Sequence, residues 1–278
     1  MNTNAARVLR CYMPPMGKAR VEYFRRDEEI KNEHRERLRA LKDIHSGKKA
    51  FIIGNAPSVA QMDLTKLKNH VTFAVNSTFL LYDKMGFQAN YTCVSDRIRW
   101  HELREKILPA SEQSRIFYCD DWEFPTPVGL FSEEERKKIT LLDQLYALSR
   151  WAHFFAPVRN QAGMFTYGKL KAKKFSHDIA QGICLGNSVI FMATQLAAYM
   201  GCNPIVLLGV EMNYDQQKTH FHGEKIWTPP MSYEKDARPW FVLFRKTLES
   251  RGIEWINATI GGNVDVLERK SLENFLTE

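Results

Sequence analysis

The chain has 278 residues, which is enough for one large α/β domain or two small ones. Its hydrophobic fraction of 44% and charged fraction of 26% are typical of a globular protein in water. The longest apolar run, residues 205–210, is too short to cross a bilayer, and no signal-peptide pattern opens the sequence. We therefore expect a soluble protein without a membrane-spanning helix.

The net charge of +7 fits an anionic ligand, a membrane surface or nucleic acid. No DNA- or RNA-binding motif accompanies the charge, so we expect no nucleic-acid partner. The five cysteines are widely spaced, odd in number and form no Cys-x-x-Cys pair. Such spacing favours reduced thiols in a cytoplasm and argues against a zinc cage.

Residues 1–45 form the first predicted unit, an N-terminal arm followed by a charged helix. Pro14, Pro15 and Gly17 indicate an irregular arm. Residues 20–45 are dense in Arg, Glu and Lys, with apolar residues at roughly helical spacing, which predicts one long helix with a narrow buried stripe. Acidic residues are interleaved with the basic ones, so ion pairs along a solvated helix are favoured over a membrane-surface role.

Residues 50–53 are a continuous apolar run, which predicts a strand buried on both faces of a parallel sheet. A turn follows it, consisting of Gly54, Asn55, Ala56, Pro57 and Ser58. Glycine permits a positive φ and a close approach of ligand to backbone, and Pro57 fits the first position of a helix over residues 59–67. Because N–H groups at a helix start attract anions, we interpret this turn as a phosphate or nucleotide site. An ordinary strand-to-helix turn is the alternative.

Three further apolar runs, residues 71–75, 91–94 and 116–119, predict strands that each end in small polar or acidic residues. Asn76 follows the first of them, and Ser95 and Asp96 follow the second. Ligands of open parallel sheets bind outside the carboxyl ends of the strands. We therefore predict a Rossmann-like, mostly parallel α/β sheet flanked by helices, with these residues beside the turn of residues 54–58.

Two predictions concern the less regular middle of the chain. Ser132, followed by three glutamates, indicates a helix start. The lysines at 169, 171, 173 and 174 are interpreted as a solvated face. Further on, Gly186, Asn187 and Ser188 precede an apolar helix over residues 189–199, and they form a second candidate anion cradle.

The run 205–210 is the clearest strand, and Glu211, Asn213 and Tyr214 follow it. Residues 212–240 contain prolines and the sequence His220-Phe221-His222, so we expect a small lid over the strand ends. Two histidines at i and i+2 face one side only in a strand, so a metal site is disfavoured and no metal is expected. A helix over 238–252, a strand over 255–259 and a tight turn complete a predicted single domain, residues 46–278.

Several short motifs occur in the same order as in a known group of bacterial proteins. These are Phe51-Ile52-Ile53-Gly54-Asn55-Ala56-Pro57-Ser58, Asp63-Leu64, Asn76, Ser95-Asp96, Gln195 to Gly201, Leu208-Gly209, Asn213-Tyr214, His220-Phe221-His222 and Asn257 to Gly262. Their order resembles that of proteins with a 6-hydroxymethylpterin diphosphokinase-like domain, found as flagellin- and surface-polysaccharide-type glycosyltransferases. The resemblance covers roughly residues 40–276; each motif alone is weak, and the ordered series is more specific.

The same framework is similar to the bacterial sialyltransferases of glycosyltransferase family 42, which work without a metal and use a His as general base. There, a Gly-Asn-Gly-Pro-Ser turn, an Asn after the second strand and a Ser-Gly helix entry hold the nucleotide of CMP-sialic acid. Carried over by position, the turn matches Gly54, Asn55, Pro57 and Ser58, with Ala56 in place of the second Gly.

The remaining positions of the resemblance match less closely. Asn76 matches the strand-two Asn, whereas Gly186, Asn187 and Ser188 match the helix entry only loosely. Glu211 stands where that family has Asp, and Tyr214 lies near its sugar-nucleotide tyrosines. His220 and His222 follow the strand much more closely than the family's base does, which leaves the base and the donor sugar open.

We therefore expect a metal-independent glycosyltransferase that uses a nucleotide-activated sugar, with a CMP-sugar favoured, in surface glycan biosynthesis. The nucleotide sugar is its substrate, no cofactor is expected, and the acceptor is a glycan or glycolipid. In this scheme His220 or His222 accepts the acceptor proton and Tyr214 donates to the departing phosphate. The expected location is the cytoplasm. A peripheral contact with the inner face of the membrane and assembly into a homo-oligomer are left open.

Two alternatives keep the fold and change the role. A pyrophosphokinase acting on a pterin alcohol would need Mg²⁺ and carboxylates at the strand ends. Asp96, Asp120, Asp121 and Glu211 are available for that purpose. The other alternative is a non-catalytic nucleotide-binding subunit that docks through the charged helix.

Overall fold

The computed structural model describes residues 18–95, 97–119, 131–144, 165–167, 174–213, 221 and 232–276. A seven-stranded sheet runs through it in the order β5-β4-β3-β2-β1-β8-β9, and every pairing in this sheet is parallel. The strands are β1 (Ala50–Ile53), β2 (Val71–Val75), β3 (Tyr91–Val94), β4 (Arg115–Cys119), β5 (Ile139–Leu142), β8 (Ile205–Leu208) and β9 (Trp255–Asn257). A separate antiparallel pair joins β6 (Phe165–Tyr167) to β7 (Lys174–Ser176).

The predicted α/β fold is confirmed. All residues of β1, β2, β3 and β8 are buried, which is why their sequences are continuous apolar runs without alternation. Such strands need cover on both faces, because neither set of side chains can face water. Two separate hydrophobic clusters, one on each face of the sheet, provide that cover.

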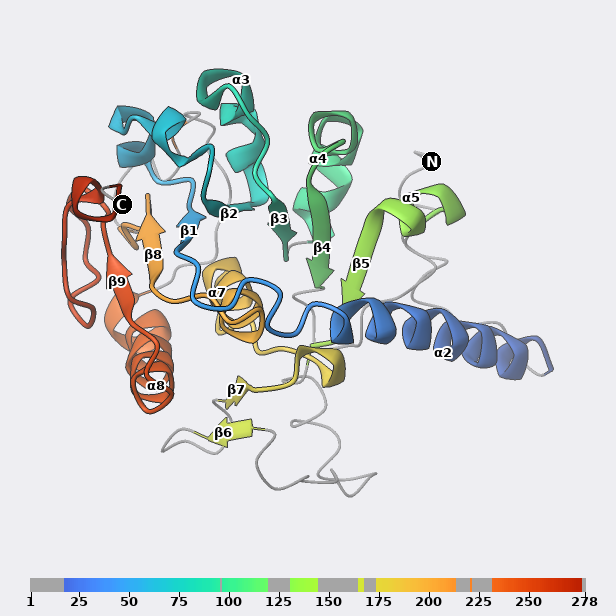
Figure 1. The fold of residues 1–278 in the computed structure, drawn as a ribbon. Helices are drawn as coiled ribbons and strands as arrows, with labels where there is room; N and C mark the ends of the chain where they lie inside the picture. Colours follow the sequence, from blue (N-terminus) through green and yellow to red (C-terminus); the bar gives the residue numbers. More distant parts are fainter. Residues whose placement is uncertain are drawn as a thin grey trace.

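Helices form the two covering layers (Figure 1). On one face lie α7 (Val189–Tyr199) and α8 (Arg238–Glu249), packed through an aromatic group of Phe191, Phe241, Phe244 and Trp255. On the other face lie α3 (Tyr82–Met85), α4 (Arg97–Ala110) and several 3₁₀ turns. Every residue of α7 is buried, which explains its composition of small and apolar residues.

The strand order reverses direction between β1 and β8. From β1 the chain moves outward through β2, β3, β4 and β5, and it then returns to place β8 and β9 on the opposite side of β1. The two connections therefore leave the carboxyl ends of β1 and β8 toward opposite sides. In open α/β sheets such a switch point is where ligands bind.

The charged helix α2 (Lys18–Arg39) covers the outer strand β5. His34 and Leu38 are buried along it, Leu41 is buried just after its end, and Lys31 and Arg35 pair with Asp143. The Nδ1 atom of His34 accepts a hydrogen bond from the N–H of Leu141 at 3.4 Å, so α2 satisfies a donor of an edge strand. The helix ends at Arg39, whereas the prediction extended it to residue 45; a series of turns follows, and Ile44 is exposed.

We expect acid to weaken this contact. The pKa of His34 is lowered to about 4, chiefly by burial. The nearby guanidinium groups of Arg37 and Arg136 also lower this pKa, whereas the charge of Glu33 acts in the opposite direction. The neutral form is therefore favoured in the folded state, and its stabilisation is complete above about pH 6.5 and lost as the pH falls toward 4. This one group should remove about 1.4 kcal/mol of unfolding free energy per pH unit in that window.

Urea unfolding at several pH values measures this slope. His34→Gln keeps a hydrogen-bonding side chain that does not titrate, so its slope should be shallower than that of the wild type by that amount. Equal slopes in the two proteins would show that His34 is not the titrating group.

Three local predictions have different outcomes. Ser132 and Glu135 form the predicted capping box at the start of α5 (Glu133–Lys138), which is confirmed. The predicted helix over residues 59–67 is instead two 3₁₀ helices, Pro57–Gln61 and Leu64–Leu67, because Met62 is extended and Asp63 caps the second one. Lys174 is only 7% exposed in β7, so the solvated-face interpretation is wrong for this lysine.

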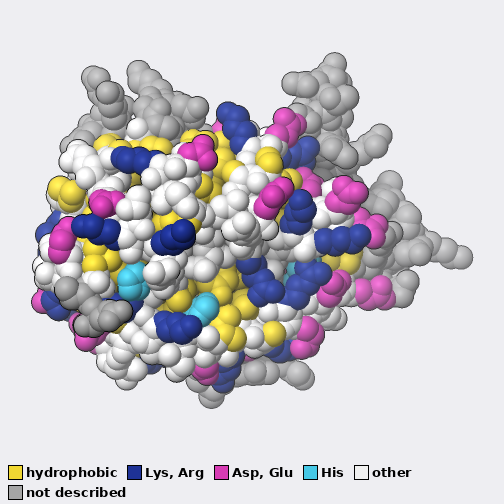
Figure 2. All heavy atoms as spheres, turned by 45° about the horizontal axis from the view of Figure 1, so that its top comes forward, with side chains coloured by type: hydrophobic (Ala, Val, Ile, Leu, Met, Phe, Trp, Pro, Cys, Tyr) yellow, Lys and Arg dark blue, Asp and Glu magenta, His cyan; other side chains and the backbone are white. Residues whose placement is uncertain are grey.

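Four of the cysteines, Cys93, Cys119, Cys184 and Cys202, are buried free thiols, and Cys11 lies outside the described residues. In the part of the chain that the structure describes, no helix is long and apolar enough to span a bilayer. Basic and acidic side chains are interspersed over the face that Figure 2 shows. The positive net charge is therefore not gathered into one patch on this face.

Candidate functional site

The turn after β1, which we call the β1 turn (residues 54–58), packs directly against the end of β8. A Cβ atom added to Gly54 would lie 2.3 Å from the carbonyl oxygen of Gly209, and one added to Gly209 would lie 2.7 Å from Cβ of Val59. The φ angle of Gly54 is not positive. Gly54 is therefore needed for the approach of two protein backbones, and the expectation that its missing side chain makes room for a ligand is wrong.

Three backbone donors of the β1 turn, those of Gly54, Ala56 and Ser58, are bonded within the protein. The N–H of Gly54 donates to the carbonyl of Leu208 at 2.7 Å, and that of Ala56 donates to Gly209 at 3.1 Å. The N–H of Ser58 donates to Oε1 of Glu211 at 2.7 Å. Pro57 has no N–H. In this conformation the turn does not offer these donors to a phosphate, which corrects the predicted mode of anion binding.

Side chains at the end of β2 extend the site. The Nδ2 group of Asn55 donates to Oγ of Ser77 at 3.1 Å, and the N–H of Ser95 donates to Oδ1 of Asn76 at 3.4 Å. Asn76 has a φ of 45°, in the left-handed region that few residues other than glycine adopt. The structure thus brings Asn55, Asn76 and Ser95 to one edge of the sheet, as the strand pattern predicts.

Thr78 holds the ends of β1 and β2 together, and sequence reasoning missed it. Its buried Oγ1 lies within hydrogen-bond distance of three carbonyl oxygens, those of Val75 at 2.8 Å, Ile53 at 3.0 Å and Gly54 at 3.3 Å. A single hydroxyl proton is shared among these acceptors. Local sequence gives no signal for this role, because the acceptors belong to two different strands.

Glu211 joins its own loop to the β1 turn and to the last turn of the chain. Its carboxylate accepts from Ser58, and its backbone carbonyl accepts from the N–H of Asn263 at 2.7 Å. A Cβ on Gly262 would lie 2.6 Å from Cα of Glu211, so the last turn also needs glycine for close packing. Asn213 lies beside the same carboxylate, with Nδ2 at 3.5 Å from Oε2.

The loop that contacts Glu211 is organised by Arg269. Its guanidinium group donates to the carbonyl oxygens of Thr259, Gly261, Gly262 and Val264. Four carbonyls in one short segment are thereby satisfied by one side chain. Arg269 is a positioning residue that sequence reasoning missed, since arginine near a chain end is common and carries no motif.

The second predicted cradle, Gly186, Asn187 and Ser188, caps α7. The carboxyl end of α7 meets residues 43–48 at the amino edge of the sheet, so its start lies toward the carboxyl edge. Oγ of Ser188 accepts from the N–H of Ile190 at 3.3 Å, and Asn187 contacts the carbonyl of Asp236. The Cα of Gly186 lies against Phe191 and Trp240. These contacts of the three residues are therefore with α7, with α8 and with the π-helix Tyr233–Ala237 that precedes α8.

Tyr214, His220, His222 and Asp96 lie outside the described residues, so their predicted roles stay predictions. Phe221, between the two histidines in sequence, is described: its N–H donates to the carbonyl of Asn55 at 2.8 Å. The predicted lid sequence thus has one residue bonded to the β1 turn. Within the described ranges, no group of three or more His, Cys, Asp or Glu side chains is arranged to hold a metal.

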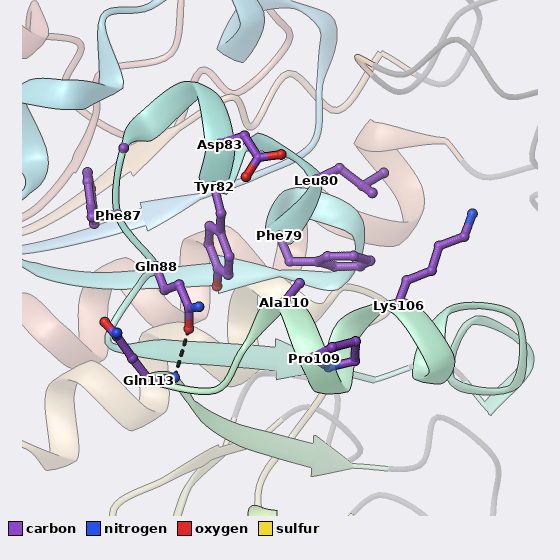
Figure 3. Close-up of a pocket in the computed structure, with 11 residues that line it drawn as sticks. Phe79, Leu80, Tyr82, Asp83, Phe87, Gln88, Lys106, Pro109, Ala110 and Gln113 are labelled. Carbon is purple, nitrogen blue, oxygen red and sulfur yellow. Dashed lines mark hydrogen bonds between the residues drawn. The ribbon is translucent and has the colours of Figure 1, made fainter.

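A hollow of about 740 Å³ lies between the segment of residues 79–88 and the last turns of α4 (Figure 3). Phe79, Tyr82, Phe87 and Pro109 line it, with Asp83 and Lys106 at its rim. The N–H of Gln113 donates to Oε1 of Gln88 at 2.8 Å beside the loops that enter β3 and β4. No residue predicted for the site lines this hollow, so it is separate from the carboxyl ends of β1 and β8.

The fold and the site together define an α/β protein with a candidate ligand site at the switch point of a parallel sheet. No protein-family model matches the chain, and no curated protein matches its sequence. The 6-hydroxymethylpterin diphosphokinase-like domain therefore stays a prediction.

Solved structures of glycosyltransferases are similar in fold. The MAf glycosyltransferase from Magnetospirillum magneticum AMB-1 aligns with 87% of this chain at a TM-score of 0.49 and 11% identity, and this chain spans 38% of that structure. The sialyltransferase CstII from Campylobacter jejuni, in complex with cytidine-5′-monophosphate, aligns over 80% of this chain and 87% of its own chain. Its TM-score is 0.41 and its sequence identity is 13%. The structure of CST-II with a trisaccharide acceptor and CMP aligns over 83% of this chain and 88% of its own chain, with a TM-score of 0.43 and a sequence identity of 14%. At these values the likenesses do not by themselves assign an activity.

Proposed function

We propose that the protein is a glycosyltransferase that uses a nucleotide-activated sugar, with a CMP-sugar as the favoured donor. The observation that carries the proposal is the position of the site: the β1 turn and Glu211 lie at the switch point between β1 and β8. The ordered motif series of the sequence supports the choice of a glycosyltransferase among proteins with such a site. The acceptor is a glycan or glycolipid of the cell surface, and the protein acts in the cytoplasm.

The described residues offer the polar groups that a nucleotide sugar needs. The amide side chains of Asn55 and Asn76 lie at the ends of neighbouring strands, where they can donate to and accept from a base or ribose. The Glu211 carboxylate, 9% exposed, lies across the switch point from them. On the sequence prediction alone, His220 or His222 is assigned as the base that takes the proton of the acceptor hydroxyl. Tyr214 is assigned as the hydrogen-bond donor to the departing phosphate.

Release of CMP from CMP-sialic acid, with and without a glycan acceptor, tests this proposal. We expect release that persists in EDTA, because the proposed chemistry uses protein groups in place of a metal. Release that requires Mg²⁺ would contradict the metal-independent mechanism. Transfer of diphosphate from ATP to a pterin alcohol, in the absence of sugar-nucleotide turnover, would contradict the glycosyltransferase and favour the pyrophosphokinase.

A further inference from the structure

The Glu211 carboxylate is buried, and no basic side chain of the described residues pairs with it. It is 9% exposed, and no Lys, Arg or His among the described residues forms an ion pair with it. Oε1 accepts the N–H of Ser58 at 2.7 Å, whereas Oε2 has only the long contact of 3.5 Å with Asn213. Two carboxylate oxygens offer about four acceptor positions. The described residues therefore leave most of this acceptor capacity unused.

A buried hydroxyl lies beside this carboxylate. Ser58 is 5% exposed, and its Oγ has no hydrogen-bond partner within the described ranges of the chain. It is three bonds from the N–H that Glu211 accepts, so covalent geometry keeps it near the carboxylate. Buried polar groups are normally satisfied, and an unpaired one costs free energy. The pair thus presents an unused acceptor and an unused hydroxyl at the switch point.

The chemistry of this pair selects against an anion. A phosphate would accept from Ser58 but would meet the negative charge of Glu211, and the N–H groups of Gly54, Ala56 and Ser58 already donate within the protein. A hydroxyl group both donates and accepts, so it can donate to Oε2 of Glu211 and accept from Oγ of Ser58. A sugar ring supplies such hydroxyls, whether it is the ribose of a nucleotide or the sugar to be transferred.

We propose that Glu211 and Ser58 recognise a sugar-ring hydroxyl of the donor and that the phosphate is held elsewhere in the site. This inference rests on the proposed function, because it names the group of the nucleotide sugar that meets the switch point. The sequence motif predicts a phosphate at the β1 turn, whereas this inference assigns a sugar hydroxyl to that turn.

Calorimetric affinities of four ligands distinguish these assignments. CMP is compared with its 2′,3′-dideoxy form to test the ribose, CMP-sialic acid with CMP to test the transferred sugar, and CMP with cytidine to test the phosphate. Hydrogen bonds to a charged group are strong, so the wild type should bind the hydroxyl-bearing ligand about 10- to 100-fold more tightly in the ribose or the sugar comparison.

Glu211→Gln is the decisive variant. Its side-chain carbonyl can still accept from Ser58, and its amide group replaces Oε2. We expect the hydroxyl preference to fall to about one- to threefold while the preference for CMP over cytidine is unchanged. Ser58→Ala should lower the same hydroxyl preference by a smaller factor. Glu112→Gln, an exposed carboxylate on the turn after α4, is the matched control and should change neither ratio.

Three outcomes would overturn the inference. If Glu211→Gln binds CMP more tightly and increases the preference over cytidine, the carboxylate lies against the phosphate. If neither hydroxyl comparison responds to Glu211→Gln while the wild type still binds CMP, the inference fails and the proposed function stands. If the wild type binds neither CMP nor CMP-sialic acid, the CMP-sugar proposal itself fails, and this inference fails with it.

Discussion

Replacing Gly54 by alanine should lower the free energy of unfolding by about 3 kcal/mol, at the upper end of the usual cost of overpacking. The added Cβ would lie 2.3 Å from the carbonyl oxygen of Gly209, which is far inside van der Waals contact. Both groups belong to backbones that leave paired strands, so neither can move as a flexible side chain would. The expected result is a shift of the urea midpoint with an unchanged m-value.

Gly252→Ala is the matched control for this substitution. Gly252 has a φ of 70° and nothing within 4 Å of its added Cβ, so its substitution costs only the left-handed backbone conformation, about 1 kcal/mol. Gly54 lacks a positive φ, and its cost comes from the contact alone. A loss at Gly54 no greater than that at Gly252 would show that the β1 turn and the end of β8 are not closely packed.

One of the two variants His220→Ala and His222→Ala should lose about 10²–10⁴-fold in turnover, with the affinity for the nucleotide little changed. A neutral imidazole, with an ordinary pKa of about 6.5, is suited to accept the proton of an acceptor hydroxyl at neutral pH. The described residue between them, Phe221, donates to the carbonyl of Asn55 at 2.8 Å. Phe221, the residue between the two histidines in sequence, is thus bonded to the β1 turn.

Turnover and nucleotide affinity should be measured separately, each with and without EDTA. His70→Ala, which removes a histidine that precedes β2 at the amino edge of the sheet, is the control and should retain turnover. Loss of nucleotide binding in both variants, in a metal-dependent manner, would identify a metal site in place of a base. Full turnover in both variants would remove the histidines from the mechanism.

Six of the seven strands of the central sheet were predicted, because nearly all of their residues are buried and form short apolar runs. The edge strand β5 was not predicted, although it is buried as well. A continuous apolar run such as residues 50–53 or 205–208 has few other stable environments, and the polar residues after each run mark the carboxyl edge. The pairing order and the switch point follow from where the chain crosses the sheet, and no local pattern encodes it. The helix boundaries at Arg39 and Glu249 also depend on the packing that follows them.

The fold positions of the candidate site residues were predictable, whereas their hydrogen-bond partners were not. Gly54 and Ser58 lie where the motif places them, yet the partners that decide their roles, Gly209 and Glu211, are more than 150 residues away in sequence. A strand-to-helix turn looks like an anion site as long as its donors are unassigned. Once the Glu211 carboxylate accepts the N–H of Ser58, the same turn favours a hydrogen-bond donor from the ligand.

The central claim is that the nucleotide binds at the carboxyl edge, at the switch point, and not in the hollow beside α4. The most direct measurement is the affinity for CMP, by calorimetry in EDTA, of the wild type, Asn55→Ala and Gln88→Ala. Loss of the neutral hydrogen bonds of Asn55 should weaken binding by about 0.5–1.5 kcal/mol, roughly 2- to 13-fold, and Gln88→Ala should bind like the wild type. Weakened binding in Gln88→Ala with wild-type affinity in Asn55→Ala would contradict the claim, as would no binding of CMP to the wild type.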